Sequence, residues 1–252
     1  MRILLLDIET APHKAMVWNL RDKNPIPLER LMEPGYTLCW AAKWLGEKEV
    51  MFSSVQNRGV KAMLRRIHAL LDKADAVIHF NGTSFDVPTL NGEFVKHGMK
   101  PPSPYKQIDL LRTCQKTFRL ASNKLDYVLR YFGLGQKVHH KGMDLWIGCM
   151  HGVAEDWATM QRYNEGDVTE LEKLYLHVRS WVRSHPNYAV FNPDTEHQCP
   201  TCGNANVQRR GTARALVNTY QRYQCKDCGT WSRTGMTMTT YEERKMILRP
   251  VV

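Results

Sequence analysis

The sequence predicts an α/β domain followed by a smaller β domain whose fold depends on cysteines. Three observations carry this prediction. A continuous apolar strand begins at residue 3, apolar residues then recur at helical spacing between short strands, and two Cys-x-x-Cys pairs lie near the carboxyl end. With 252 residues, of which 43% are hydrophobic, the chain can bury one good-sized core and a small second one.

Composition narrows the range of functions. No apolar run approaches the roughly 18 residues that span a bilayer, and the N-terminus lacks the pattern of a signal peptide. We therefore expect a cytoplasmic protein without a membrane partner. Seven cysteines, four of them in two close pairs, indicate a reducing compartment and a bound metal rather than disulfides. The net charge of +10 suggests a polyanionic partner.

The first predicted strand, residues 3–10, ends in two acids. Its continuous apolar run is typical of a strand buried on both faces. Because side chains alternate along a strand, Asp7 and Glu9 point to the same side. Two carboxylates this close repel each other, and a divalent cation between them would relieve the repulsion. Oxygen ligands favour Mg²⁺ or Mn²⁺, although the octapeptide alone fits two ordinary surface acids equally well.

The next segments supply a loop, a hairpin and a helix. Residues 11–33 contain three prolines and alternating charges, and are predicted as a long loop. Strands at 36–45 and 49–53 are expected to pair across the turn at Gly46. Apolar residues at the spacing of one helical face predict a helix over 57–73.

A strand–loop–helix junction then places a third acid at a strand end. A short buried strand at 76–80 is followed by a polar loop and a helix, for which Ser84 is the predicted N-cap. Sites in α/β folds are usually built at such junctions, so Asp86 in the first turn is a candidate site residue. Asp109 is predicted to cap the helix that follows it rather than to bind a metal.

A helix is predicted over residues 124–132 and a longer one over 155–182. Asn164 and Asp167 interrupt the apolar stripe of the longer helix, and Tyr163 lies one turn before Asp167. Residues four apart lie on one side of a helix, so the hydroxyl and the carboxylate can address one point. A solvated polar pair is the alternative, and it fits a buried stripe less well.

Several other chemically distinctive residues are predicted to have structural or solvated positions. Cys39, Cys114 and Cys149 are isolated and are expected in the core. His139 and His140 stand between two lysines, for which we expect a solvated loop rather than a phosphate contact; the lysines are Lys137 and Lys141.

In sequence order, the acids and the tyrosine form three motifs. These are Asp7-Ile8-Glu9-Thr10, Asn81-Gly82-Thr83-Ser84-Phe85-Asp86 and Tyr163-Asn164-Glu165-Gly166-Asp167. The set resembles the tyrosine branch of the DEDD superfamily of 3′–5′ exonucleases, which includes proofreading domains of family A and B DNA polymerases and ribonuclease D-type enzymes. The sister branch has His five residues before its last Asp, where this chain has Arg162. Phage-encoded stand-alone members are a looser resemblance, through Asp109-Leu110 and Leu145-Trp146.

This resemblance covers about residues 1–183 and implies a ribonuclease H-like fold: a mixed five-stranded sheet flanked by helices. It implies two Mg²⁺ or Mn²⁺ ions that together activate the nucleophile and stabilise the leaving oxygen. Asp7 would bridge them, Glu9 and Asp167 would complete one site, Asp86 would support the other, and Tyr163 would orient the attacking water. The products would be nucleoside 5′-monophosphates from a single-stranded or frayed DNA 3′ end. The implied substrate contacts are Thr10, Asn81, Phe85 and Asn164.

The cysteine pairs predict a second metal site of a different kind. The pair Cys199 and Cys202 is separated by 22 residues from the pair Cys225 and Cys228, and each pair is followed by Gly. Four thiolates at this spacing suit one structural Zn²⁺. The pattern resembles a zinc ribbon. We therefore expect an exonuclease domain over 1–183, a linker over 184–198 and a ribbon with a tail over 199–252. Nucleic acid is favoured over a purely structural or protein-docking role, through Arg209, Arg210, Arg214, Arg222, Lys226 and Trp231.

Three other functions are compatible with parts of this pattern. The same residues would serve a 3′–5′ exoribonuclease, because nothing in the sequence reads a 2′-hydroxyl. A ribonuclease H-like protein of transposase type often carries a zinc ribbon but needs neither an Asp-x-Glu pair nor Tyr-x₃-Asp. A catalytically inactive adaptor would be expected to have lost an acid. DNA replication or repair is the expected setting, with no partner identified.

Overall fold

The structure, a computed structural model, describes residues 1–19, 25–137, 141–191 and 197–249. It divides into two compact units, one of residues 2–176 and one of residues 177–252 together with Met1. The predicted boundaries at 183 and 198 stay predictions. The expected linker contains a short 3₁₀ turn, Tyr188–Val190, among its described residues.

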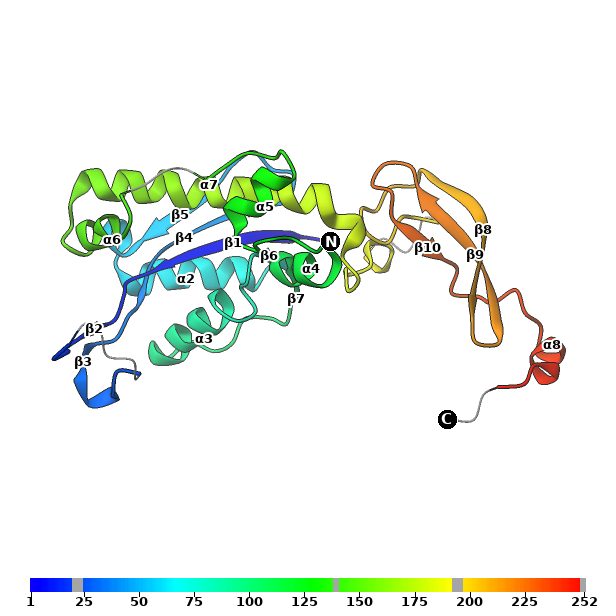
Figure 1. The fold of residues 1–252 in the computed structure, drawn as a ribbon, viewed down its shortest axis with the longest axis horizontal. Helices are drawn as coiled ribbons and strands as arrows, with labels where there is room; N and C mark the ends of the chain where they lie inside the picture. The colour runs from blue at the N-terminus through cyan, green and yellow to red at the C-terminus, as the bar shows by residue number, and fades with distance from the viewer. Residues whose placement is uncertain (20–24, 138–140, 192–196, 250–252) are drawn as a thin grey trace. The chain divides into compact units, whose positions relative to one another are not determined.

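A mixed five-stranded sheet forms the centre of the first unit (Figure 1). Its strands, in spatial order, are β5 (Met51–Ser54), β4 (Thr37–Trp44), β1 (Ile3–Thr10), β6 (Ala76–His79) and β7 (Lys106–Asp109). β4 and β5 run antiparallel to their neighbours, whereas β1, β6 and β7 are parallel. The central position of β1 explains why its first four residues are uniformly apolar and buried. The predicted ribonuclease H-like sheet is confirmed.

The two faces of β1 have different chemistry. Leu4, Leu6 and Ile8 belong to a core that also contains side chains of α2 (Val60–Leu71) and α3 (Asp86–Lys96). The alternate side chains, which include Asp7 and Glu9, therefore point to the opposite face. That face is covered by α6 (Met143–Met150) and α7 (Ala154–Val178). The strand thus separates a purely apolar layer from a layer that carries carboxylates.

Two predicted segments need correction. Residues 11–33 are not one loop, because β2 (Lys14–Ala15) and β3 (Leu31–Glu33) pair antiparallel and a 3₁₀ turn (Leu28–Arg30) precedes β3. The expected helix over 57–73 is two helices, α1 (Val55–Arg58) and α2. They are divided at Gly59, whose positive φ of 72° no regular helix accommodates.

The remaining helices of the first unit are α4 (Leu110–Thr117) and α5 (Leu125–Tyr131). Asp109 caps α4 as predicted, accepting hydrogen bonds from the backbone N–H groups of Leu111 and Arg112. Ser84 does not cap α3: Phe85 occupies the N-cap position without a side-chain hydrogen bond. The long predicted helix ends as α7 at Val178 and continues as a 3₁₀ turn (Arg179–Trp181). The three isolated cysteines are buried, as expected.

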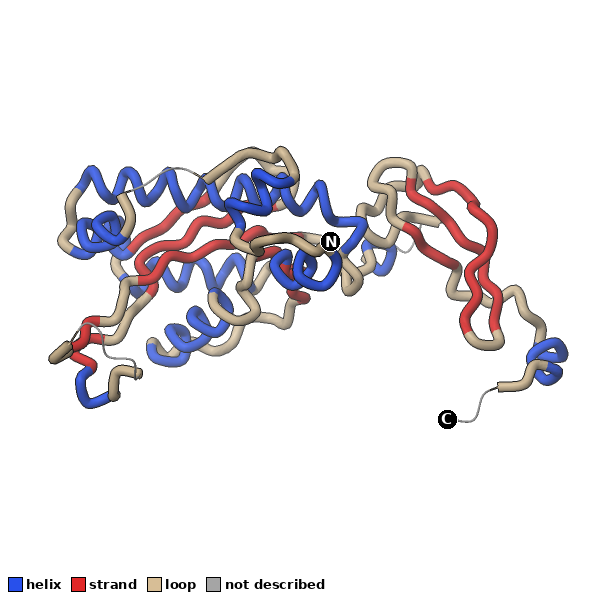
Figure 2. The backbone as a smooth tube through the Cα atoms, in the orientation of Figure 1, coloured by secondary structure: helices blue, strands red, loops and turns tan. Residues whose placement is uncertain are grey.

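The second unit contains a three-stranded antiparallel sheet, drawn in red in Figure 2. Its order is β10 (Trp231–Arg233), β9 (Asn218–Cys225) and β8 (Val207–Ala215), followed by α8 (Tyr241–Met246). Four cysteines gather at one end of this β region, which is compatible with a zinc ribbon. Among the described residues of the whole chain, no helix has the length and apolarity needed to cross a membrane.

Candidate metal centre and nucleic-acid site

Three carboxylates meet between β1 and α7. Asp7 and Glu9 lie one pleat apart on β1, and Asp167 lies on the stripe of α7 that packs over that face. One oxygen from each lies within 4.8 Å of the others, which is close enough to share an ion. Asp167 is only 2% exposed, so its charge is held away from bulk water. Carboxylate oxygens are the ligands that Mg²⁺ and Mn²⁺ prefer.

Asp86 contacts the same strand along the edge at which β1 pairs with β6. β6 pairs with β1 only as far as Leu5, so the β1 backbone beyond that point lacks a strand on this edge. Asp86, the first residue of α3, fills the gap and accepts a hydrogen bond from the Ile8 N–H at 3.1 Å. Asp86 is not one of the three acids in the tightest group, but its charge acts on Asp7.

The acids hold their protons more firmly than isolated carboxyls. Burial, followed by repulsion from Asp86, Asp167 and Glu9, raises the pKa of Asp7. Burial and Asp167 raise the pKa of Glu9 to about 8. Burial raises the pKa of Asp86 to about 7. A site whose own acids repel each other is one that a divalent cation stabilises, because the cation replaces the protons and cancels the repulsion.

Tyr163 and Asp167 do address one point, and a lysine occupies it. The Lys137 ammonium donates to Asp167 Oδ2 at 2.6 Å and to the Tyr163 hydroxyl at 3.0 Å. The prediction of a solvated loop is therefore wrong for Lys137. Lys137 contacts Tyr163 and Asp167, which lie 26 and 30 positions further along the chain, and no local sequence pattern indicates contacts at that separation. His139 and His140 lie outside the described residues.

Asn164 holds Asp7. It is fully buried, and its side-chain amide donates to Asp7 Oδ2 at 2.6 Å. The sequence places Asn164 next to Tyr163 but gives no sign of this contact, which spans 157 positions. The predicted role of Asn164 in binding substrate is untested, and its position fits the orientation of Asp7 better.

The predicted substrate residues lie at the rim of the acid cluster. Phe85 is 44% exposed although it directly precedes the buried Asp86. Asn81 is exposed and has a positive φ of 71°. Thr10 lines a cavity of about 350 Å³ next to Glu9, whose other walls are Pro12, Gly142, Met143 and Trp146. An exposed ring next to Asp86 and a cavity next to Glu9 are features that can contact a nucleotide.

A buried network holds the loop between β6 and α3. Besides capping α4, Asp109 accepts the backbone N–H groups of Asn81 at 3.1 Å and Thr83 at 3.4 Å. His79 is fully buried beneath this loop, and a Cβ on Gly82 would lie 2.3 Å from its ring. The loop can therefore pack here only with glycine at position 82. The sequence predicts the cap at Asp109 but not this second function at the loop.

Another buried acid, Glu170, lies one turn beyond Asp167. Burial and the charge of Asp167 raise the pKa of Glu170 to about 7. Glu170 does not belong to the group of three acids that could share an ion. The sequence does not single it out, because a glutamate near a lysine on a long helix is common on exposed faces.

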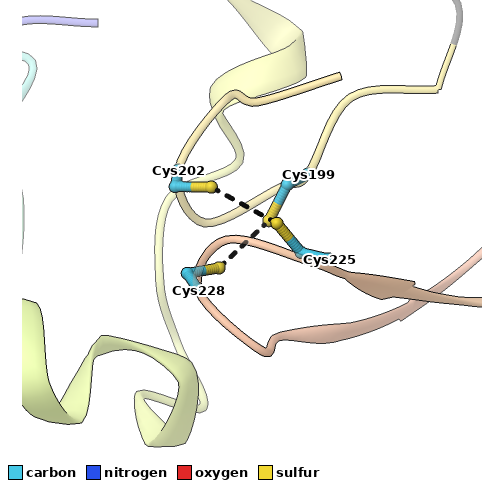
Figure 3. A group of neighbouring side chains, drawn as sticks. All are labelled: Cys199, Cys202, Cys225 and Cys228. Carbon is cyan, nitrogen blue, oxygen red and sulfur yellow. Dashed lines mark hydrogen bonds between the residues drawn. The ribbon is translucent and has the colours of Figure 1, made fainter. Parts of the chain in front are cut away.

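The second unit contains a site with a different donor set. The sulfur atoms of Cys199, Cys202, Cys225 and Cys228 lie within 4.8 Å of one another and point inward (Figure 3). Two of the separations are 3.5 and 3.6 Å. Tetrahedral Zn²⁺ with bonds of about 2.3 Å places its sulfurs about 3.8 Å apart. The four thiols therefore fit a zinc ion, and Gly203 and Gly229 have the positive φ that each turn requires.

Several basic and aromatic residues of the second unit are on its surface. The guanidinium of Arg222 lies 4.7 Å above the ring of Trp231, which is 51% exposed, and that of Arg233 lies 3.6 Å from the ring of Tyr220. All the residues of this unit that are predicted to contact nucleic acid are exposed: Arg209, Arg210, Arg214, Arg222, Lys226 and Trp231.

Comparison with known proteins identifies the class to which this fold belongs. A sequence profile of the RNase_H superfamily matches residues 37–179. The chain belongs to that superfamily. A solved structure, that of the family B DNA polymerase from the hyperthermophilic archaeon Pyrobaculum calidifontis, shares the fold with a TM-score of 0.54 and 18% identity. The similarity covers 71% of this chain and 24% of that one. No curated protein sequence matches the chain.

Proposed function

We propose that this protein is a metal-dependent 3′–5′ exonuclease that hydrolyses DNA from its 3′ end to nucleoside 5′-monophosphates. The observation that carries the proposal is the group formed by Asp7, Glu9 and Asp167, with Tyr163 one turn before the last acid. Its carboxylates and their raised pKa values fit a hard divalent cation. This arrangement is the one that the tyrosine-branch resemblance predicts, on a fold that the superfamily provides.

The side chains of the site would have separate roles in metal binding and in water orientation. Two bound Mg²⁺ or Mn²⁺ ions would supply Lewis-acid activation of water and stabilise the leaving oxygen. Asp7, Glu9, Asp86 and Asp167 would hold them, with Asn164 fixing the orientation of Asp7. The Tyr163 hydroxyl would orient the water, because it lies on the same helix edge as Asp167 and is only one turn away.

The exposed rim would hold the 3′-terminal nucleotide. Phe85 offers a ring on which a base can stack, and an exposed aromatic contact of this kind is worth about 1–3 kcal/mol per base. The cavity beside Glu9, lined in part by Thr10 and Trp146, has room for part of a nucleotide. Asn81 projects from the loop that precedes Phe85. A single-stranded or frayed end suits this rim, because a base must leave its stack to reach Phe85.

The ribbon would hold the rest of the strand. Its exposed arginines and Trp231 combine phosphate-binding charge with a stacking surface, and its four cysteines would bind one structural Zn²⁺. In this proposal the first unit would hydrolyse the phosphodiester bond and the second unit would increase the affinity for the nucleic acid.

Digestion of end-labelled oligonucleotides tests the proposal. A 5′-labelled single-stranded DNA should shorten progressively with Mg²⁺ or Mn²⁺ and stay intact with EDTA. A 3′-labelled strand should release labelled mononucleotide at once. Faster cleavage of RNA of the same sequence would make the protein an exoribonuclease, and internal cuts without progressive shortening would overturn the exonuclease assignment.

Replacement of Asp7 by Asn tests the assignment of the site. Loss of a metal ligand should raise the barrier by several kcal/mol, and each ~1.4 kcal/mol is tenfold in rate. Glu165→Gln is the matched control, because Glu165 lies on α7 between Tyr163 and Asp167 but its carboxylate accepts from Gln161 on the exposed side, at 2.7 Å. Nearly full activity in Asp7→Asn protein would refute the metal role of the acids.

A further inference from the structure

A lysine ammonium lies among the acids. Its Nζ is 2.6 Å from Asp167 Oδ2, 3.0 Å from the Tyr163 hydroxyl and 5.0 Å from the centre of the Tyr163 ring. The main chain of Lys137 is itself fixed, since its N–H donates to Asp126 Oδ1 at 3.2 Å. With about a quarter of its side chain exposed, Lys137 is a partly buried charge at a defined position.

The charges at this site do not balance without a ligand. Asp7, Glu9, Asp86 and Asp167 can carry four negative charges, and Lys137 carries one positive charge. Two divalent cations would change the excess from three negative charges to one positive charge. One phosphodiester group carries one negative charge and would bring the total to zero. The lysine therefore makes the cation-loaded site complementary to a single scissile phosphate.

We propose that Lys137 is a resident counterion that opposes divalent-cation binding and promotes phosphodiester binding at the acid cluster. The proposal rests on the proposed function, and it assigns a role that the three sequence motifs do not contain. Its physical basis is that one fixed positive charge acts with opposite sign on the two ligands. It repels a cation that needs Asp167, and it attracts the phosphate that replaces water at the loaded site.

The two effects can be measured separately from turnover. Lys137→Met removes the charge and keeps the length of the side chain, whereas Lys137→Arg keeps the charge. Lys141→Met is the matched control: Lys141 follows in the same connection, and its Nζ pairs with Asp156 Oδ1 at 2.8 Å rather than with the acid cluster. Circular dichroism and thermal melting of each variant establish that it is folded before its binding is compared.

Cation binding is measured first, without nucleic acid. Titration with Mn²⁺, followed by the electron paramagnetic resonance signal of the free ion, gives the affinity of the protein alone. Charges a few ångströms apart in a partly buried site interact strongly enough that we expect Lys137→Met to bind the first ion about tenfold more tightly. Lys137→Arg and Lys141→Met should stay within about twofold of the natural protein. Equal affinity in Lys137→Met and Lys141→Met would overturn the counterion role.

Phosphodiester binding is measured second, at saturating Ca²⁺, with a short single-stranded DNA whose terminal linkages are phosphorothioate. Lys137→Met should bind it about tenfold more weakly, and its slope of log affinity against log salt should be shallower by about 0.7, as expected when one phosphate loses its cationic partner. Unchanged affinity and slope would overturn this half of the proposal. If the natural protein does not cleave nucleic acid, the proposed function fails, while the Mn²⁺ measurement still decides whether Lys137 opposes cations.

Discussion

Asp109→Ala should destabilise the first unit far more than the loss of a helix cap alone. The Asp109 carboxylate accepts four backbone N–H groups, two at the start of α4 and two in the loop before α3, and the residue is 8% exposed. Loss of the cap costs about 1 kcal/mol. Each of the two loop N–H groups left without an acceptor adds about 1 kcal/mol. The expected loss is therefore about 3 kcal/mol.

Thermal unfolding measures this loss. For a unit of this size, about 3 kcal/mol corresponds to a decrease in Tm of about 6–12 °C. Ser54→Ala is the control, because Ser54 caps α1 through a bond from the Asn57 N–H and its replacement should cost about 1 kcal/mol. If the two variants lose the same stability, the loop bonds of Asp109 contribute nothing and the reasoning is refuted. Cleavage by Asp109→Ala should also require more substrate, because Phe85 lies on the released loop.

Three further outcomes are expected. Tyr163→Phe should slow turnover by roughly 10- to 1,000-fold, with a decrease in Tm of only a few degrees, if the hydroxyl orients the water; an unchanged turnover rate would give Tyr163 a packing role alone. In EDTA, stability should fall between about pH 5 and 8, because the pKa values of Glu9 and Asp86, about 8 and 7 when folded, lie above their unfolded values, and the unfolded chain releases those protons first. Saturating Mn²⁺ should flatten that dependence, and a rise in stability across this range would contradict the raised pKa values of both acids. Replacing Arg209, Arg210 and Arg214 by Gln should reduce the salt slope of single-stranded DNA binding by about 0.7 for each phosphate that these arginines neutralise; an unchanged slope would favour a structural or protein-docking ribbon.

Local patterns predict the parts of the fold that local physics determines. The apolar run of β1, the buried stripe of α7 and the cap at Asp109 each depend on residues a few positions apart, and all are present. Gly59 divides the helix predicted over residues 57–73. The spacing of apolar residues could not predict this break, because it carries no information on the backbone conformation of a glycine. The β2–β3 pair escapes prediction because its strands have only two and three residues.

In the candidate site, too, some residues can be predicted from local sequence patterns and others cannot. The acids can be selected from the sequence because they end an apolar strand, begin a helix after a strand–loop junction, or interrupt an apolar helical stripe. Lys137 cannot, because its position depends on how the connection after α5 passes α7, and lysines in polar connections are usually solvated. The contact of Asn164 with Asp7 likewise depends on the packing of α7 over β1. Long-range contacts of this kind follow from tertiary structure and have no signature in a single sequence.

The alternation of side chains along β1 couples correct strand pairing to assembly of the acid cluster. In the observed register, Leu6 pairs with Ala42 and Asp7 with Ala41, and the register shifts only at the bulge between Glu9 and Thr10. A slip of one residue would turn Asp7 and Glu9 toward the apolar layer and bring Leu6 and Ile8 to the position of the acid cluster. Such a misfolded chain would bury two charges in the core while exposing apolar surface, so cellular quality control would have a strong signal for removing it. The residues that build the acid cluster therefore disfavour a stably folded chain in which β1 is mispaired.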